Sequence, residues 1–179
     1  MGKHVLFLIN MNDITNQCEA VLKELGRFSN DVAFLGTAII DNRLNEFEEK
    51  LGFTLPVDFK YIIACYNGVS LDGTEIYGLG DVFRKASLDK IYDFEHFVVE
   101  NKMPLHFVPF SPDGRGNHYC LDLSQMVDGV CLIKFWQWNF SYNDIAEVET
   151  THGNFVEWIN DVMIDWTLED INYDGSLKK

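Results

Sequence analysis

Apolar residues recur at helical spacing between residues 41 and 66, and this stretch is predicted to form two short helices around which the fold is organised. Leu44, Phe47 and Leu51 follow an i, i+3, i+7 pattern, which places them on one helical face. The other faces carry charged residues that are expected to be solvated: Glu46, Glu48, Glu49 and Lys50. The second helix has its apolar side at Phe59, Ile62, Ile63 and Tyr66. We interpret the pair as a packing unit without catalytic residues.

The ends of these two helices carry local signals. Asp41 is predicted to cap the first helix, and Gly52 to end it in a left-handed conformation. Pro56 suits the first position of the second helix, because its missing N–H would be unpaired there in any case. Asp58 lies in the first turn, where the helix dipole favours an anion. Asn67-Gly68 is predicted to be the turn that closes the pair.

The remaining segments before residue 104 are predicted with less regular patterns. Residues 4–9 are predicted to be a strand or a tail, residues 13–28 a helix, residues 31–40 a strand and residues 74–79 another strand. Ser87 is predicted to cap a helix that runs to Glu100. Its inward positions are expected to be Ile91, Phe94 and Val98.

From residue 105 the apolar period becomes two, which is typical of strands. Strands are predicted at 105–110, 118–123 and 130–140, with a loop at 113–117 and a hairpin turn at Asp128-Gly129. A last helix is predicted to begin at Thr150 or Thr151 and the tail at 174–179 to fray. The side chains of that helix expected to face the core are those of Phe155, Trp158, Ile159, Val162 and Trp166. The succession of elements predicts an α+β fold in a single domain, with a mostly antiparallel sheet backed by helices.

The strand at 130–140 is rich in aromatic residues. Cys131, Ile133 and Phe135 share one of its faces, and the face with Lys134, Trp136 and Trp138 is predicted to emerge toward solvent. Two interpretations stay open for the tryptophans. Buried core is the ordinary one, and we expect it for at least one of the two. Exposed aromatics beside acidic groups are instead typical of an interface anchor.

The charge balance narrows the classes of partner. The chain of 179 residues has 14 basic and 28 acidic residues, a formal net charge of −14. Nucleic acid and anionic membrane surfaces are disfavoured, because both require clustered lysine and arginine. A cationic protein partner is favoured, because opposite fields steer encounter. The alternative is that the acidity only maintains solubility.

Cysteine usage and the N-terminus predict a cytoplasmic protein. The four cysteines form no C-x-x-C pair and are expected to be buried free thiols in a reducing compartment: Cys18, Cys65, Cys120 and Cys131. The apolar run from Val5 to Ile9 is too short for a signal peptide or a membrane span.

No pattern for catalysis or for a cofactor is present. Gly114-Arg115-Gly116 lacks the third glycine and the following helix of a dinucleotide loop, so we interpret it as a turn. His118 and Cys120 share a strand face, but the sequence names no further metal ligands. No serine or cysteine lies in a recognisable nucleophile motif. We therefore expect no metal, no cofactor and no enzymatic activity.

Three spaced groups of residues together resemble a known family. The first runs from Leu44 through Phe47-Glu48, Leu51-Gly52, Leu55-Pro56 and Asp58-Phe59-Lys60 to Tyr66-Asn67-Gly68. The second comprises Val108-Pro109-Phe110, Asp113-Gly114, Gly116-Asn117, Tyr119 and Leu121-Asp122, and the third comprises Asn154-Phe155 and Trp158-Ile159. This pattern, over residues 37 to 165, resembles the SUKH superfamily of fungal cell-wall-assembly regulators and bacterial immunity proteins. Val69 and Asn117 depart from the usual glycine and aspartate.

The resemblance implies an α+β fold without known catalysis. It divides the chain into an extension (1–36), a SUKH-like domain (37–166) and a tail (167–179). The motif residues are interpreted as structural: Leu55, Pro56, Asn67, Gly68, Pro109, Gly114, Gly116 and Asp122. The bacterial members imply a protein that binds and neutralises a toxin, often a nuclease, encoded by an adjacent gene.

This leads to one main hypothesis and two alternatives. The main one is an immunity protein that binds a basic toxin domain through an acidic surface. The alternatives are a regulator or scaffold of the cell-wall-assembly type and a small-ligand binding module. Partner-binding candidates, in loops or at strand ends, are Asp72, Glu75, Asp81, Trp136, Trp138, Asp144 and Glu147.

Overall fold

The computed structural model describes the backbone of residues 2–80 and 86–179 and the side chains of residues 13–80 and 86–179. Its α-helices are α1 (Gly2–Leu25), α2 (Arg43–Leu51), α3 (Val57–Cys65), α4 (Leu88–Asp93), α5 (Phe155–Trp158) and α6 (Trp166–Asp170). The π-helices are η1 (Phe94–Val98) and η3 (Ile159–Asp165), and η2 (Ile145–Glu147) is a 3-10 helix. The strands are β1 (Ala33–Leu35), β2 (Val69–Leu71), β3 (Thr74–Ile76), β4 (Phe107–Pro112), β5 (His118–Val127), β6 (Val130–Trp136) and β7 (Glu149–His152).

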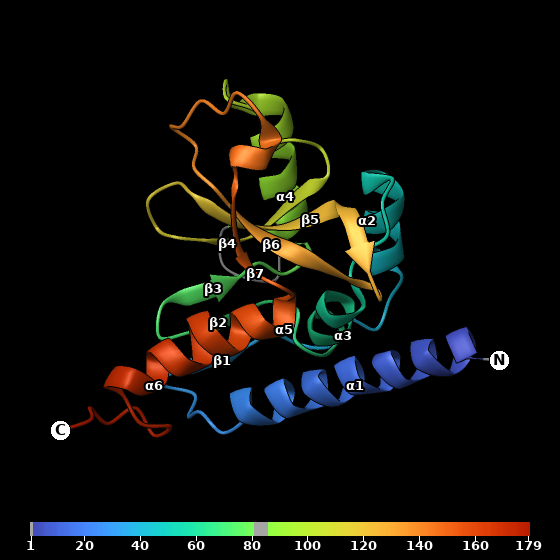
Figure 1. Ribbon diagram of the computed structural model, residues 1–179. Coiled ribbons are helices and arrows are strands. Elements are labelled where there is room, and N and C mark those ends of the chain that lie inside the picture. The colour runs from blue at the N-terminus through green and yellow to red at the C-terminus, as the bar shows by residue number, and fades with distance from the viewer. Residues whose placement is uncertain (1, 81–85) are drawn as a thin grey trace.

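The strands form two antiparallel sheets, which confirms the predicted α+β fold but replaces one sheet by two. The first has the order β1-β2-β3 and the second β4-β5-β6-β7. The sheets are joined where the N–H of Tyr77 donates to the carbonyl of Phe110 at 2.9 Å. In Figure 1, α3 and the segment from α5 to α6 lie between α1 and the four-stranded sheet, and α4 lies on the far side.

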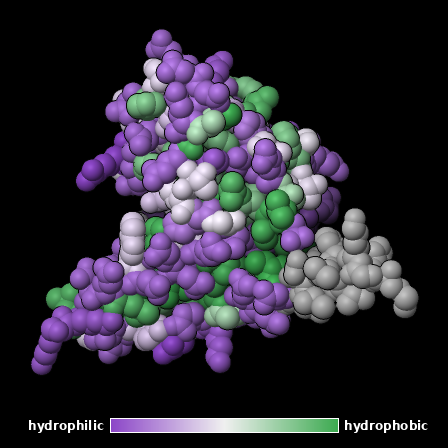
Figure 2. All heavy atoms as spheres, in the orientation of Figure 1, coloured by the Kyte–Doolittle hydropathy of each residue, from purple (hydrophilic) through white to green (hydrophobic). Residues whose placement is uncertain are grey.

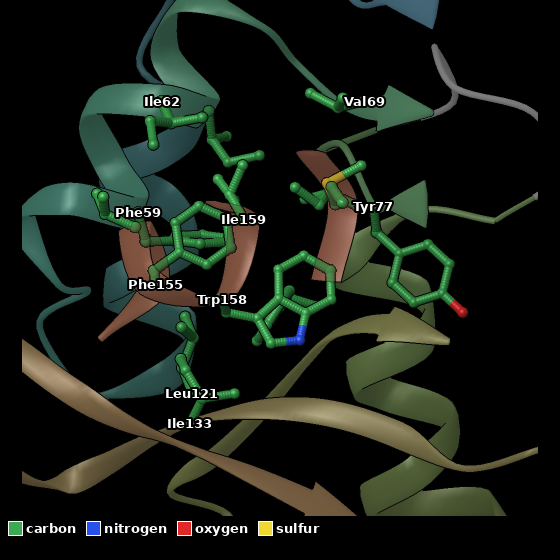
Figure 3. Close-up of a cluster of buried hydrophobic side chains, with 14 of the residues drawn as sticks. Phe59, Ile62, Val69, Tyr77, Leu121, Ile133, Phe155, Trp158 and Ile159 are labelled. Atoms are coloured by element: carbon green, nitrogen blue, oxygen red, sulfur yellow. The ribbon is translucent and has the colours of Figure 1, made fainter. Parts of the chain in front are cut away.

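A core of aromatic side chains joins the helices to the larger sheet (Figure 3). Phe59 of α3 and Phe155 of α5 meet with ring centroids 4.9 Å apart. Phe110 of β4 contacts Trp158 edge-on, with centroids 4.8 Å apart. Edge-to-face pairs of this kind stabilise a core by about 1 kcal/mol each beyond the area that they bury. Cys18, Val21 and Leu25 of α1 extend the same cluster.

The helix pair is confirmed, with two differences at its ends. Gly52 has a φ of +70° and its N–H donates to the carbonyl of Glu48, as a left-handed C-cap requires. Asn42 occupies the N-cap position, and Asp41 accepts from the N–H of Arg43 at 3.2 Å. Pro56, with a ψ of 145°, is the N-cap of α3 and not its first helical residue.

Several predicted boundaries are wrong. Residues 4–9 belong to α1, because a short apolar run does not distinguish a strand from part of a helix. That helix ends at Leu25, and the strands predicted at 31–40 and 74–79 shrink to three residues each. The last helix begins at Phe155, because Asn154 caps it by accepting from the N–H of Glu157 at 2.8 Å. The predicted starting threonines belong to β7.

The predictions of which side chains face inward are wrong in two helical segments. Phe94 and Val98 are 48% and 67% exposed, and Glu95 and His96 are buried in their place. The buried positions Leu88, Tyr92, Glu95 and His96 have ordinary helical spacing, so the prediction selected the neighbouring face of the same helical segment. In the second segment, the wider π turns of η3 rotate the following side chains around the helix axis and leave Trp166 exposed by 53%.

The two tryptophans of the 130–140 segment have opposite environments. The strand ends at Trp136, which is buried in a small second cluster with Met103, Phe107 and Cys120, so the prediction that this face emerges to solvent is wrong there. Trp138 lies beyond the strand and is exposed. One buried and one exposed tryptophan agree with the expectation that at least one is core.

Two smaller expectations also change. Cys65 is exposed, whereas the other three cysteines are buried as predicted. Burial raises the pKa of the Cys18 thiol to about 12, so this group is an unreactive thiol at neutral pH. The tail that was expected to fray is folded back, because the N–H of Lys178 donates to the carbonyl of Asp170 at 2.8 Å.

Candidate functional site

The loop from Asp113 to Asn117 is held in one conformation by its own first residue. One carboxylate oxygen of Asp113 accepts from the N–H groups of Arg115 (2.7 Å) and Asn117 (2.9 Å), and the other accepts from the side-chain amide of Asn117 (2.6 Å). Partial burial raises the pKa of Asp113, but these hydrogen bonds outweigh it and leave the pKa below its usual value. The loop is therefore a rigid border for its surroundings.

A groove of about 1050 Å³, here called the Trp138 groove, lies between this loop, the end of η1 and the segment after β6. Figure 1 shows that segment beside α4 and η1, at the end of the molecule away from α1. The groove is lined by Ile91, Phe94, Glu95, Val99, Glu100, Asn101, Arg115, Gly116, His118, Trp138, Asn139 and Ser141. Its apolar and aromatic lining residues are Ile91, Phe94, Val99 and Trp138. Its exposed polar ones are Glu100, Arg115, Asn139 and Ser141, and its two buried side chains are Glu95 and His118.

The indole of Trp138 is fixed against the loop. Its Nε1–H donates to the carbonyl of Arg115 at 3.1 Å. A Cβ at Gly116 would lie 2.8 Å from Trp138 Cδ1, so this close approach requires glycine. The side-chain amide of Asn101 donates to the carbonyls of Trp138 (2.8 Å) and Phe140 (2.9 Å) and ties the η1 side of the groove to the Trp138 side.

Glu95 and His118 form the floor of the groove. Both side chains are only 7% exposed, and His118 Nδ1 lies 3.9 Å from Glu95 Oε1, beyond hydrogen-bond range. Within the described part of the chain Nδ1 has no hydrogen-bond partner, whereas Nε2 lies 3.4 Å from the hydroxyl of Tyr77. Burial lowers the pKa of His118 to about 4, so the ring is neutral at physiological pH. Burial also raises the pKa of Glu95.

A second depression, here called the β3 hollow, lies on the other side of the same loop. It has a volume of about 400 Å³ and is lined by Gly73, Thr74, Glu75, Pro112, Asp113, Gly114, Tyr119, Val162 and Trp166. Burial raises the pKa of Tyr119, and the carboxylates of Asp113, Glu149 and Asp161 raise it further. None of the lining side chains is basic, so the potential in this hollow is negative.

The structure separates the predicted partner-binding residues into different environments. Asp72, in the β2–β3 turn with a φ of +45°, adjoins the β3 hollow, and Glu75 lines it. Trp138 lines the groove, whereas Trp136 is buried and is not available to a partner. Asp81 lies outside the described residues.

Asp144 and Glu147 are exposed but have local structural partners. Asp144 caps η2 by accepting from the N–H of Ala146 at 2.9 Å. Glu147 accepts from the N–H of Asn143 at 3.0 Å. Both therefore shape the segment that carries Trp138.

The sequence did not indicate Glu95 or His118 as site residues. Glu95 falls outside the helical face predicted to be buried and lies on the neighbouring face with Leu88 and Tyr92. His118 was recognised only as sharing a strand face with Cys120. Trp166 was expected in the core and instead borders the β3 hollow. No local pattern marks these three residues, because their environment comes from segments distant in sequence.

The motif residues have observable roles in the scaffold. The side chain of Asn67 pairs with both backbone groups of Leu79: Oδ1 accepts from the N–H at 2.6 Å, and Nδ2 donates to the carbonyl at 3.0 Å. Asp122 accepts from the N–H of Ser124 at 3.1 Å. Leu55 is fully buried, and Pro109 lies opposite Cys120 between β4 and β5.

Further motif residues act at turns. Gly68, Gly114 and Gly116 have positive φ values. Glu48 was expected to be solvated, and this is wrong: its carboxylate accepts from the N–H of Leu55 at 2.7 Å and from Lys60 Nζ at 3.0 Å. The bond to the N–H of Leu55 fixes the chain between α2 and α3.

The described side chains include no group of three or more histidine, cysteine, aspartate or glutamate residues arranged to hold a metal ion. Over the same part of the chain, no helix combines the length and the apolar character needed to cross a bilayer. Figure 2 shows a face on which hydrophilic side chains cover most of the surface and apolar ones form small patches between them.

Comparison with known proteins gives one positive result. No curated protein matches the chain. The family model described as SMI1 / KNR4 family (SUKH-1) matches residues 39–161, which contain the helix pair, both sheets except β1, and α5. Since this match covers well over half of the 179 residues, the chain belongs to the SMI1 / KNR4 family, SUKH-1.

Proposed function

We propose that this chain is a non-catalytic immunity protein of the cytoplasm that neutralises a cognate basic toxin domain, such as a nuclease, by direct binding. Membership of the SUKH-1 family supports this role, because the superfamily that the motifs resemble includes bacterial immunity proteins. The observation that carries the proposal is the acidic β3 hollow. There Asp113, Glu149 and Asp161 act together on Tyr119, and no basic side chain lines the surface.

The charge of the chain explains how such a complex would form. A nuclease that grips phosphates has a basic cleft, and a protein with a net charge of −14 is attracted to it over long range. The resulting association is fast at low ionic strength and slows as salt screens the charges. A complex held in this way blocks the cleft without any chemical step.

The test is binding to the product of the adjacent gene. The two proteins are co-expressed, and the complex is titrated calorimetrically at about 0.05 M and about 0.5 M salt. We expect the toxin to be inactive in the complex and the affinity to fall at the higher salt. A neighbour that is not toxic, or that does not bind at low salt, contradicts the proposal.

A small-ligand binding module is the second candidate, and the Trp138 groove favours it. A concave site with apolar walls and a few buried polar groups is the usual form of a ligand pocket. Native mass spectrometry of protein purified from its host tests this candidate. A co-purifying small molecule of constant mass that is lost on denaturation supports it, and a bare polypeptide mass contradicts it.

A further inference from the structure

The Trp138 groove combines an aromatic and apolar wall with a buried carboxylate at its floor. We infer that the groove receives a lysine or arginine side chain of the basic partner, with the aliphatic stem along Phe94, Val99 and Trp138 and the cationic head at Glu95. This inference rests on the proposed function and assigns the groove as the anchor point of the complex. The β3 hollow would then contribute mainly to the approach of the partner.

The floor has the hydrogen-bonding character of a cation site. No lysine or arginine of the described residues lies within salt-bridge distance of Glu95, and its neighbour His118 is neutral. In the tautomer that places the proton on Nε2, facing Tyr77, the unpartnered Nδ1 of His118 is an acceptor. A cationic head between Glu95 and His118 would donate to both side chains and would satisfy the buried Nδ1 acceptor.

The walls fit an amino-acid side chain better than an inorganic ion. A metal ion requires several oxygen, nitrogen or sulfur ligands, and the floor presents one carboxylate and one imidazole nitrogen. The exposed indole of Trp138 instead offers a π face to a cation and an apolar surface to its stem. Arg115 at the mouth opposes a cation, but it is exposed and Glu100 lies in the same lining.

The groove is also formed before any partner arrives. Asn101 and the Arg115 carbonyl hold the Trp138 segment in place, so binding does not have to order it. A buried carboxylate without a cation is costly to the folded state, and no contact within the described chain compensates for that of Glu95. An incoming cation supplies the missing compensation.

The experiment compares Glu95→Gln with wild type. Glutamine preserves the shape of the side chain and removes its charge, and we expect the melting temperature to stay equal or rise. Glu49→Gln, which removes one exposed charge on α2, is the matched control. Two ligands are used: Nα-acetyl-argininamide, followed by NMR at the indole N–H of Trp138, and the toxin domain from the adjacent gene.

We expect the argininamide to shift the Trp138 signal saturably in wild type and in Glu49→Gln, with an affinity on the order of millimolar, and to have no effect on Glu95→Gln. Glu95→Gln should weaken toxin binding by about 30-fold or more, mostly through faster dissociation, and the control by less than about 3-fold. If Glu95→Gln does not fold, Trp138→Ala replaces it in the toxin-binding measurement, because this exposed side chain is removable without opening the core. The argininamide titration then compares wild type with Glu49→Gln alone.

The outcomes separate this inference from the proposed function. If Glu95→Gln binds the toxin with the same affinity as wild type, the inference is overturned and the proposed function still stands. A Trp138 signal that does not respond to the argininamide also overturns it. An argininamide response without any toxin binding identifies a site for small organic cations, and it overturns both the partner assignment and the proposed function.

Discussion

The carboxylate of Asp58 in α3 accepts a hydrogen bond of 2.9 Å from the backbone N–H of Phe155, the first residue of α5 and 97 positions further along the chain. Its other oxygen accepts from the N–H of Phe59 at 2.9 Å. The residue is fully buried, so this one side chain fastens the C-terminal helices to the helix pair. Asp58 was expected to interact with the dipole of its own helix. In the structure Asp58 also accepts from a backbone N–H in the first turn of α5, which has no partner within that helix.

We expect Asp58 to make stability depend on pH. Burial raises its pKa from 3.8 to about 6 despite the hydrogen bonds that favour the charged form. Because the folded pKa is the higher one, the contribution to stability is complete below the unfolded value and is lost as pH rises through about 6. A shift of this size corresponds to about 3 kcal/mol. Urea unfolding of wild type and of Asp58→Asn at pH values from about 4 to about 6 measures this loss of stability.

The comparison with Asp58→Asn isolates this group, because other buried acids such as Glu95 titrate in both proteins. We expect the free energy of unfolding of wild type, relative to the variant, to fall as pH rises from about 4 to about 6. A difference that is constant over this window would show that Asp58 titrates normally in the folded protein.

Asn67→Ala should destabilise the protein strongly. The variant leaves the N–H and the carbonyl of Leu79 without their side-chain partner in a buried position. The loss of both bonds is expected to lower the free energy of unfolding by about 2–4 kcal/mol. Asn45→Ala is the control, because Asn45 is exposed and its amide donates only to the side chain of Asn42. Urea denaturation that gives similar values for the two variants would contradict the role assigned to Asn67.

Gly116→Ala is expected to displace Trp138. The new Cβ would lie 2.8 Å from the indole, and the φ of +93° is unfavourable for alanine. Gly114→Ala is a matched control, because it has a φ of +78° but no atom within 4 Å of the new Cβ. Both variants should lose about 1–2 kcal/mol to backbone strain. Only Gly116→Ala should shift the NMR signal of the Trp138 indole N–H and weaken ligand binding in the groove.

Removing charges beside the β3 hollow should slow association with the toxin domain. Asp72→Asn combined with Glu149→Gln removes two negative charges there, and Glu46→Gln combined with Glu49→Gln removes two from α2. Both double variants have the same net charge, so a difference between them reports the local field. Stopped-flow mixing at low salt should show association about 3-fold slower for the first pair and nearly unchanged for the second. Equal rates for the two pairs would place the encounter surface elsewhere.

Local signals predicted a large part of this fold. The spacing of Leu44, Phe47 and Leu51, the left-handed Gly52 and the Asp128-Gly129 turn are all observed, because each depends on residues within one turn of the chain. The faces of the segments after Phe94 and after Ile159 were not predicted. The first buried face carries the polar residues Glu95 and His96, which an apolar pattern does not mark. In the second, the π turns of η3 change the angle between successive side chains without altering the apolar pattern.

The same distinction separates the scaffold from the candidate site. The helix pair, the β-hairpins, the acidic charge and the family were predictable from the sequence, because these depend on short-range patterns and on composition. Tertiary structure decided that Trp136 is buried while Trp138 is exposed, that Asp58 bonds to Phe155, and that Glu95 and His118 meet at the floor of one groove. Burial and desolvation are properties of segments that pack together from distant parts of the chain. This packing gives Glu95 and His118 an environment that their neighbours in sequence do not reveal.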